Sequence, residues 1–307
     1  MKKRLLVIIG ARGIGDLIYH LPLLRSLYLS FKKKIIILSN KVNHAKEVYK
    51  NESFYDRIIS FDNTRYGIFK TIQNIIKFRN LINKLNVDRL ILTANYRRLV
   101  IPVLLSNVKK KDIFGVGKFQ ITKDKSLNHL TISERLIKYT NKLKLPIKEN
   151  NFFLSRKKFK NLKKSNKRQI FINIDSHHDQ NNWPIKNYLA IIEKLKKKNI
   201  LYINFAPNKK ELKKIFLKTK YYCKNVHYTY NKNIFKIIQI INSCKYVIGN
   251  ESGPICLGSS LKKDVHAIYI PVHTKPESKI IFAKNKYYNT DKMNSQKIIK
   301  KILGSIK

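Results

Sequence analysis

Short apolar runs that alternate with helix-like stretches constrain the fold more than any other feature of this chain. The first run, Leu5–Ile9, is typical of a buried strand, and the stretch after it places Leu17, Leu21 and Leu24 at helical spacing. A similar alternation continues to the C-terminus, with a break over residues 144–167. Alternating strands and helices favour a parallel sheet that is covered by helices on both faces. We therefore predict an α/β fold.

The expected elements follow from the period of the apolar residues. We expect strands at residues 5–9, 35–38, 57–61, 89–93, 112–116, 169–174, 201–205, 246–248 and 265–270. We expect helices from residue 16 onward and at 43–49, 69–85, 99–105, 131–143, 185–197, 209–217, 234–242, 254–260 and 295–306. In the helix at 69–85, one face is predicted to carry Phe69, Ile72, Ile76, Leu81 and Leu85.

The length of 307 residues is enough for two domains with separate cores. Residues 144–167 contain Pro146 and runs of Lys and Asn with little periodicity, which indicates an interdomain linker with its flanks. We place an N-terminal domain at 1–150 and a C-terminal domain at 151–307. Ligands of such folds bind at the carboxyl ends of the strands.

The chain is strongly basic, with 65 Lys and Arg, 18 Asp and Glu, and a net charge of +47. Such a surface attracts polyanions, among them nucleic acid, anionic lipid and phosphorylated glycan. The alternative is compositional drift, because Lys, Asn, Ile and Tyr are enriched together throughout. No aromatic-basic RNA motif or recognition-helix pattern is evident, so nucleic acid is not the expected partner.

The three cysteines, Cys223, Cys244 and Cys256, form no C-x-x-C pair. This sparse, odd set argues for a reducing compartment and against a disulfide framework or a zinc site. The first apolar run is too short for a signal peptide, and no segment approaches the roughly 20 apolar residues of a membrane span. We expect a cytoplasmic protein, with peripheral attachment to the inner face of the membrane left open.

The stretch from Gly10 to Arg25 joins a strand, a glycine loop and a helix, with Asp16 at the helix start. One reading is that Asp16 is a helix cap, and another is that it is a reactive group. A dinucleotide loop fits poorly. The glycines run G-x-x-G-x-G, and the next strand ends in Ser39-Asn40 without an acid for a ribose hydroxyl.

A second strand–turn–helix stretch, Tyr246 to Ser260, contains Asn250-Glu251-Ser252-Gly253 before a helix that opens at Pro254. Backbone N–H groups, a hydroxyl and a glycine converge there, which suits a diphosphate. The alternative is a tight turn in which Ser252 caps the helix.

Three stretches of the chain resemble glycosyltransferase family 9, the lipopolysaccharide heptosyltransferases. The first is Gly15-Asp16 six residues before Pro22, and the second is Asn250 to Leu261. The third is the run from Ile174 to Trp183-Pro184. The resemblance implies a GT-B fold of two Rossmann-like domains and an inverting, metal-independent glycosyltransferase that uses no cofactor.

The resemblance also assigns residues to roles. Asp16 would be the catalytic base, and Gly15 and Arg12 would contact the acceptor. Donor contacts would come from Ser176, His177, Asn181, Glu211, Glu251, Ser252, Gly253 and Cys256. The chain departs from the family where Glu251 replaces Asp, where Cys256 replaces His and where Asn181 stands at the usual Lys. The adjacent histidines 177 and 178 have no further ligands in view, so no metal site is expected.

The implied partners are a nucleoside-diphosphate sugar resembling ADP-heptose, a lipid-linked saccharide acceptor of lipopolysaccharide-core type, and an anionic membrane surface. The alternative function is that of a catalytically inactive, transferase-like protein that binds anionic glycan or nucleic acid through its basic surface. The two donor-site departures favour this alternative, and the presence of Gly15-Asp16 argues against it.

Overall fold

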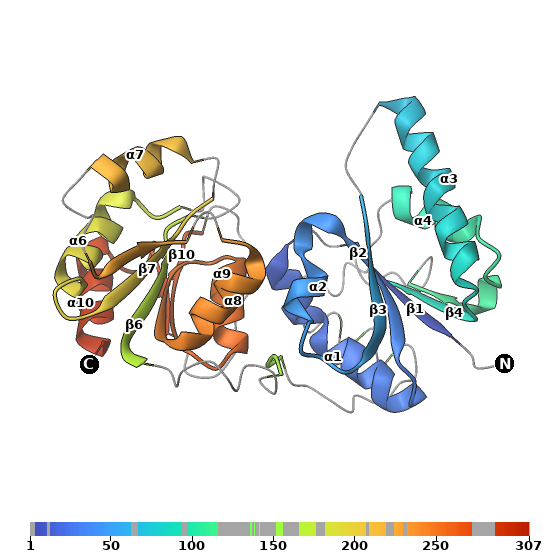
Figure 1. The fold of residues 1–307 in the computed structure, drawn as a ribbon, viewed down its shortest axis with the longest axis horizontal. Helices are drawn as coiled ribbons and strands as arrows, with labels where there is room; N and C mark the ends of the chain where they lie inside the picture. The colour runs from blue at the N-terminus through green and yellow to red at the C-terminus, as the bar shows by residue number, and fades with distance from the viewer. Residues whose placement is uncertain are drawn as a thin grey trace. The chain divides into compact units, whose positions relative to one another are not determined.

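The structure is a computed structural model with two compact units, Met1–Phe152 and Phe153–Lys307. It describes residues 4–10, 13–62, 67–93, 97–115, 136, 138, 141, 152–155, 166–175, 182–206, 209–218, 224–229, 232–271 and 286–306. Each unit is a parallel sheet with helices on both faces (Figure 1). The α/β prediction is therefore confirmed. Most of the expected helix at 131–143 and most of the expected linker lie outside the described residues.

The N-terminal unit is built on five parallel strands in the order β3-β2-β1-β4-β5. The strands are β1 (Leu5–Ile9), β2 (Ile35–Asn40), β3 (Tyr55–Phe61), β4 (Arg89–Leu92) and β5 (Ile113–Phe114). The helices are α1 (Ile14–Phe31), α2 (Ala45–Val48), α3 (Ile68–Leu85) and α4 (Arg97–Leu104), with single 3₁₀ turns η1 (Lys41–Asn43) and η2 (Lys110–Asp112). Helices α1 and α2 lie on one side of this sheet, and α3 and α4 lie on the other (Figure 1).

The five apolar residues predicted to share one face of α3 lie on two faces, since Leu81 and Leu85 pack on the core. Phe78, Ile82 and Leu85 are buried among strand residues, whereas three of the predicted face residues are exposed. Those three are Phe69, Ile72 and Ile76, with 86%, 50% and 49% of their surface accessible. The prediction of a single face was wrong because α3 carries apolar residues at helical spacing on two faces, and spacing alone does not tell which of them meets the sheet.

The C-terminal unit has six parallel strands in the order β11-β10-β9-β6-β7-β8. The strands are β6 (Asn166–Asn173), β7 (Ile200–Asn204), β8 (Val226–Tyr228), β9 (Cys244–Asn250), β10 (Asp264–Tyr269) and β11 (Lys286–Asn289). The helices are α6 (Ile185–Leu195), α7 (Lys210–Lys218), α8 (Ile234–Ser243), α9 (Gly253–Ser260) and α10 (Ser295–Ser305). The edge strands β8 and β11 were not predicted, because each is short and carries few apolar residues. Strand β6 begins at Asn166, inside the expected linker.

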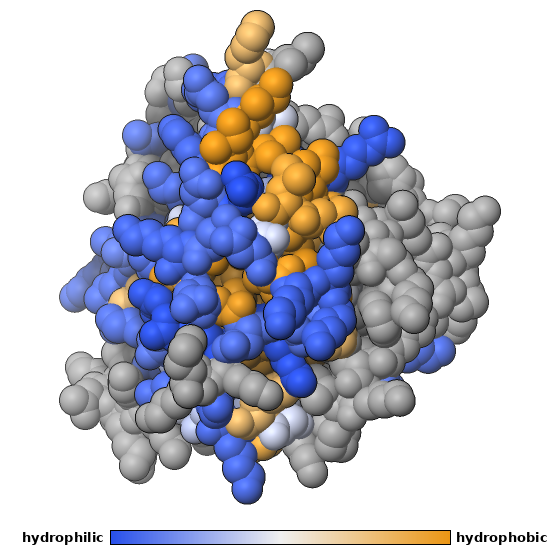
Figure 2. Space-filling view, turned by 90° about the vertical axis from the view of Figure 1, so that its right-hand side faces the viewer, coloured by the Kyte–Doolittle hydropathy of each residue, from blue (hydrophilic) through white to orange (hydrophobic). Residues whose placement is uncertain are grey.

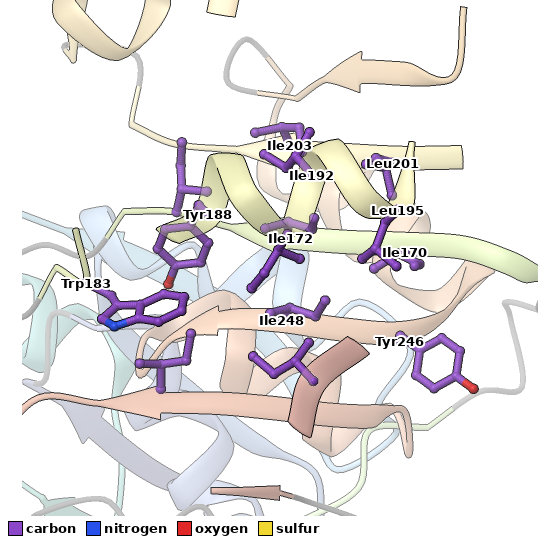
Figure 3. Close-up of a cluster of buried hydrophobic side chains, with 14 of the residues drawn as sticks. Ile170, Ile172, Trp183, Tyr188, Ile192, Leu195, Leu201, Ile203, Tyr246 and Ile248 are labelled. Atoms are coloured by element: carbon purple, nitrogen blue, oxygen red, sulfur yellow. The ribbon is translucent and has the colours of Figure 1, made fainter. Parts of the chain in front are cut away.

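One core cluster of this unit lies between the sheet and a layer formed by α6, α7 and α10. Figure 3 shows Ile172, Ile248 and Ile203 of three strands facing the side chains of α6. At one end of this layer, Trp183 packs edge-on against Tyr188, with ring centroids 5.2 Å apart. Trp183 is 3% exposed and packs in the core just before the start of α6.

Both sheets change direction beside their first strand. In the N-terminal unit the chain passes from β1 to β2 on one side and later to β4 on the other. In the C-terminal unit β6 lies between β7 and β9 in the same way. Loops leave in opposite directions at such a switch point, which opens a crevice at the carboxyl ends of the strands. Asp16 and Ser252 follow β1 and β9, which lie at these two points.

Candidate active site

Asp16 lies in the first turn of α1, directly after β1. Gly13 is the N-cap residue, and its backbone N–H donates to Asp16 Oδ2 over 3.0 Å. Asp16 is therefore not the N-cap itself, but its carboxylate caps the helix start from the third helical position. A Cβ atom at residue 13 would lie 2.8 Å from Asp16 Oδ2, so a side chain there would displace the carboxylate. Gly15 is half-buried in the same turn.

His20 contacts this turn through its side chain, and the sequence did not lead us to expect this contact. The side chain is 4% exposed, with Nδ1 2.6 Å from the Asp16 carbonyl oxygen and Nε2 2.8 Å from Thr93 Oγ1. Thr93 follows β4, so the two hydrogen bonds join the first turns of α1 to the end of β4 at the switch point. Burial lowers the pKa of His20, while contact with Asp16 opposes this shift. The spacing of His20, one helical turn after Asp16, could have indicated the contact.

In the C-terminal unit, polar side chains connect the ends of β6 and β9. Asn173 Nδ2 donates both to the Asp175 carbonyl oxygen, over 2.5 Å, and to Ser252 Oγ, over 3.0 Å. Because one nitrogen contacts both groups, the segments that follow β6 and β9 lie side by side. Asn250 is fully buried, and its Oδ1 accepts from the backbone N–H of Trp183 and from the Tyr188 hydroxyl, each over 2.9 Å.

Ser252 is the N-cap residue of α9, but its side chain makes no capping bond to the helix. Its hydroxyl donates instead to the Asn250 carbonyl oxygen over 2.8 Å and accepts from Asn173. Ser252 therefore occupies the N-cap position, but its side chain leaves the N–H groups at the start of α9 without a capping bond from it. The start of α9, with Gly253 at its first position, keeps the dipole end and N–H groups that favour an anion.

Glu251 lies beside Ser252, and its Oε2 accepts from the Tyr287 hydroxyl over 2.9 Å. Burial raises the pKa of Glu251 to about 7, and the bond from Tyr287 works against that shift. Tyr287 comes from β11, an edge strand that was not predicted, so this contact could not be foreseen. Cys256 is 4% exposed on the first turns of α9.

An acid after β6, Asp175, and a cation after β7, Lys209, were also missed. Asp175 is 6% exposed, and its carboxylate accepts from Asn182 Nδ2 and the Ala206 N–H, each over 3.1 Å. Lys209 Nζ lies 4.0 Å from Asp175 Oδ1. An acid directly after a buried strand was the signal available in the sequence.

The other predicted residues divide into two groups. Glu211 is exposed in the first turn of α7, which follows β7. Four lie outside the described residues, namely Arg12, Ser176, His177 and Asn181. Among the residues that the structure describes, no group of three or more His, Cys, Asp or Glu could hold a metal ion. Within the same part of the chain, no helix is long and apolar enough to span a bilayer.

Two parallel-sheet α/β units with polar clusters at their switch points define the class of GT-B glycosyltransferases. The family model for glycosyltransferase family 9 (heptosyltransferase) matches residues 118–303. The chain belongs to this family, as its three motifs indicated. No curated protein sequence matches it.

Solved structures agree over almost the whole chain. A glycosyl transferase family 9 protein from Veillonella parvula matches with a TM-score of 0.75 and 15% identity, covering 100% of this chain and 91% of its own. The E. coli ADP-heptose lps heptosyltransferase II matches with a TM-score of 0.70 and 13% identity, covering 99% of this chain and 98% of its own. The E. coli heptosyltransferase WaaC with ADP matches with a TM-score of 0.73 and 12% identity, covering 98% of this chain and 97% of its own. At these identities the likeness establishes the fold, and with the family match it supports sugar transfer.

Proposed function

We propose that this chain is an inverting glycosyltransferase that moves a heptose or related sugar from a nucleoside diphosphate to a lipid-linked saccharide. The observation that carries the proposal is Asp16 at the start of α1, where the Gly13 N–H holds its carboxylate and His20 contacts its carbonyl oxygen. Similar structures hold ADP or ADP-2-deoxy-2-fluoro heptose, which favours an ADP-heptose-like donor. In this proposal residues 1–150 bind the acceptor, with contacts from Gly15 and Arg12, and residues 151–307 bind the donor.

Inversion takes place in one displacement. The acceptor hydroxyl loses its proton to Asp16 as its oxygen bonds to the anomeric carbon, and the bond from that carbon to the diphosphate breaks. The diphosphate leaves with the electron pair. The hydrogen bond from the Gly13 N–H orients the Asp16 carboxyl group. In its ionised form a carboxylate only accepts hydrogen bonds, as a base must.

The departing diphosphate needs positive charge and N–H donors. The start of α9 would supply the donors, together with Ser252 and Gly253. Lys209 is our choice for the cation, because Asn181 stands where the family has Lys and Lys209 lies 4.0 Å from Asp175 of the same loop. Glu251, Cys256, Glu211, Ser176 and His177 complete the proposed donor site.

A lipid-linked acceptor suits a protein that works at a membrane surface. With a net charge of +47, the chain should be attracted to an anionic leaflet, where each nearby Lys or Arg contributes about 1 kcal/mol. We propose peripheral attachment at the inner face of the membrane, with the cytoplasm as the compartment.

The test is transfer from ADP-heptose to a lipid-linked saccharide by the wild type and by Asp16→Asn. The amide keeps an oxygen for the Gly13 N–H but is not a base, so turnover should fall about 10²-fold or more with donor affinity little changed. Exposed Asp56 of the same unit offers a control, since Asp56→Asn removes an equal charge. Turnover of Asp16→Asn near the wild-type rate would refute the assignment.

An inactive, transferase-like binding protein is the second candidate, and the Glu251 and Cys256 departures favour it. It predicts that nucleoside diphosphates or anionic glycans bind while no tested sugar nucleotide is turned over. A thermal-shift screen of nucleoside diphosphates and their sugars separates the two candidates, when it is followed by transfer assays on each ligand that binds.

A further inference from the structure

The N-terminal unit presents an apolar surface that its core does not use. On α3, Phe69, Ile72 and Ile76 are exposed and fall within about 60° of one another around the helix axis. They point away from the buried residues Phe78 and Ile82 of the same helix. An exposed apolar stripe on the side opposite the core marks an interaction surface.

Helix α4 extends this surface. Ile101, Leu104 and Leu105 are 40%, 43% and 55% exposed. Arg79 Nε donates to the Leu105 carbonyl oxygen over 2.9 Å, and the Asn107 N–H donates to Asn83 Oδ1 over 2.8 Å. These bonds fix the end of α4 against α3. We call the exposed side chains of Phe69, Ile72, Ile76, Ile101, Leu104 and Leu105 the α3–α4 surface.

Basic side chains border the α3–α4 surface. On α3, Lys77 and Lys84 lie on one side of the stripe and Arg79 on the other, all exposed. Over residues 67–111 the chain has ten Lys or Arg and a single acid, Asp88. Figure 2 looks onto this side of the molecule and shows an apolar stripe flanked by hydrophilic side chains.

We propose that the α3–α4 surface is the site at which the protein docks on an anionic lipid bilayer. Apolar side chains would enter the boundary between headgroups and acyl chains while the flanking Lys and Arg reach anionic headgroups. An 18-residue helix lying in that plane is about 27 Å long. The inference rests on the membrane attachment proposed above and gives it a defined surface.

Charge favours a bilayer over a second copy of this chain as the partner of the α3–α4 surface. A second copy of this chain would bring two basic surfaces together, and like charges repel. The flanking side chains are long and flexible, so they can spread to meet fluid headgroups. The apolar residues also protrude, with Phe69 86% exposed, as insertion into lipid requires.

The experiment is co-sedimentation of the full chain with vesicles of neutral lipid, with and without anionic lipid. The variant Phe69→Ser/Ile72→Ser/Ile76→Ser keeps every charge, and its partition onto anionic vesicles should fall at least about 10-fold. A matched pair refines the test. Leu104→Ser lies in the surface and should weaken binding about 3-fold, whereas Leu29→Ser, at similar exposure on α1, should leave it unchanged.

Equal binding of the wild type and the triple variant would overturn the docking site and leave membrane attachment in place. Binding of the wild type to no vesicle would overturn both, while the transfer assay on a soluble acceptor still tests the sugar chemistry. The melting temperature of the triple variant, measured beside the wild type, checks that the variant is folded. Loss of a wild-type dimer in that variant would assign it to a second copy.

Discussion

Glu251 is a buried carboxyl group that should make stability depend on pH near neutrality. Its pKa is raised to about 7, against about 4.3 in an unfolded chain. The folded state therefore holds the proton more tightly, so this group stabilises the fold below about pH 4.3. That stabilisation, of about 4 kcal/mol, is lost as the pH rises from about 4.3 through 7.

The variant Glu251→Gln keeps an oxygen for the Tyr287 hydroxyl and does not titrate. Relative to the wild type, its free energy of unfolding should therefore rise between pH 5 and pH 8. Urea denaturation at the two pH values measures the difference, and other groups cancel in the comparison. Parallel pH dependence in the two proteins would mean that Glu251 is ionised across this range.

At the scale of elements, the pairing of β6 with β9 depends on Gly249. Gly249 lies opposite Asn173, and a Cβ atom there would sit 2.2 Å from the Asn173 carbonyl oxygen. The oxygen belongs to the backbone, so only a shift of the strands could make room. Gly249→Ala should cost about 3 kcal/mol of stability and weaken donor binding, because Asn173 holds Asp175 and Ser252.

Gly304→Ala is the matched control for this substitution. A Cβ atom at Gly304, near the end of α10, meets nothing within 4 Å. Alanine favours helix over glycine, so the change should leave stability the same or raise it by up to about 1 kcal/mol. Urea denaturation and calorimetry with a nucleoside diphosphate test both variants. Equal effects of the two substitutions would show that the close approach of β6 and β9 is unimportant.

At the scale of the whole molecule, 65 basic side chains face only 18 acidic ones. Like charges on one folded chain repel, and salt screens them over a Debye length of about 8 Å at physiological ionic strength. The melting temperature should therefore rise as sodium chloride increases from about 20 mM to about 300 mM. A melting temperature that falls over this range would indicate that the basic residues are mostly stabilised by ion pairs.

The sequence by itself determined the α/β class, the order of most elements and three motifs. These features depend on local spacing: Leu5–Ile9 is apolar enough to be a strand, and Asp16 and Ser252 follow strands directly. It also determined the family, because motif residues keep their order along the chain.

The tertiary structure decided which residues meet. The contacts of His20 with Thr93, of Asn173 with Ser252 and of Glu251 with Tyr287 join residues 73, 79 and 36 positions apart. It also decided which face of α3 is buried, because two faces have helical apolar spacing and only packing against β1 and its neighbours selects one. The local pattern of apolar residues determines whether a segment is a helix or a strand, whereas the burial of apolar area determines which of its faces packs on the core.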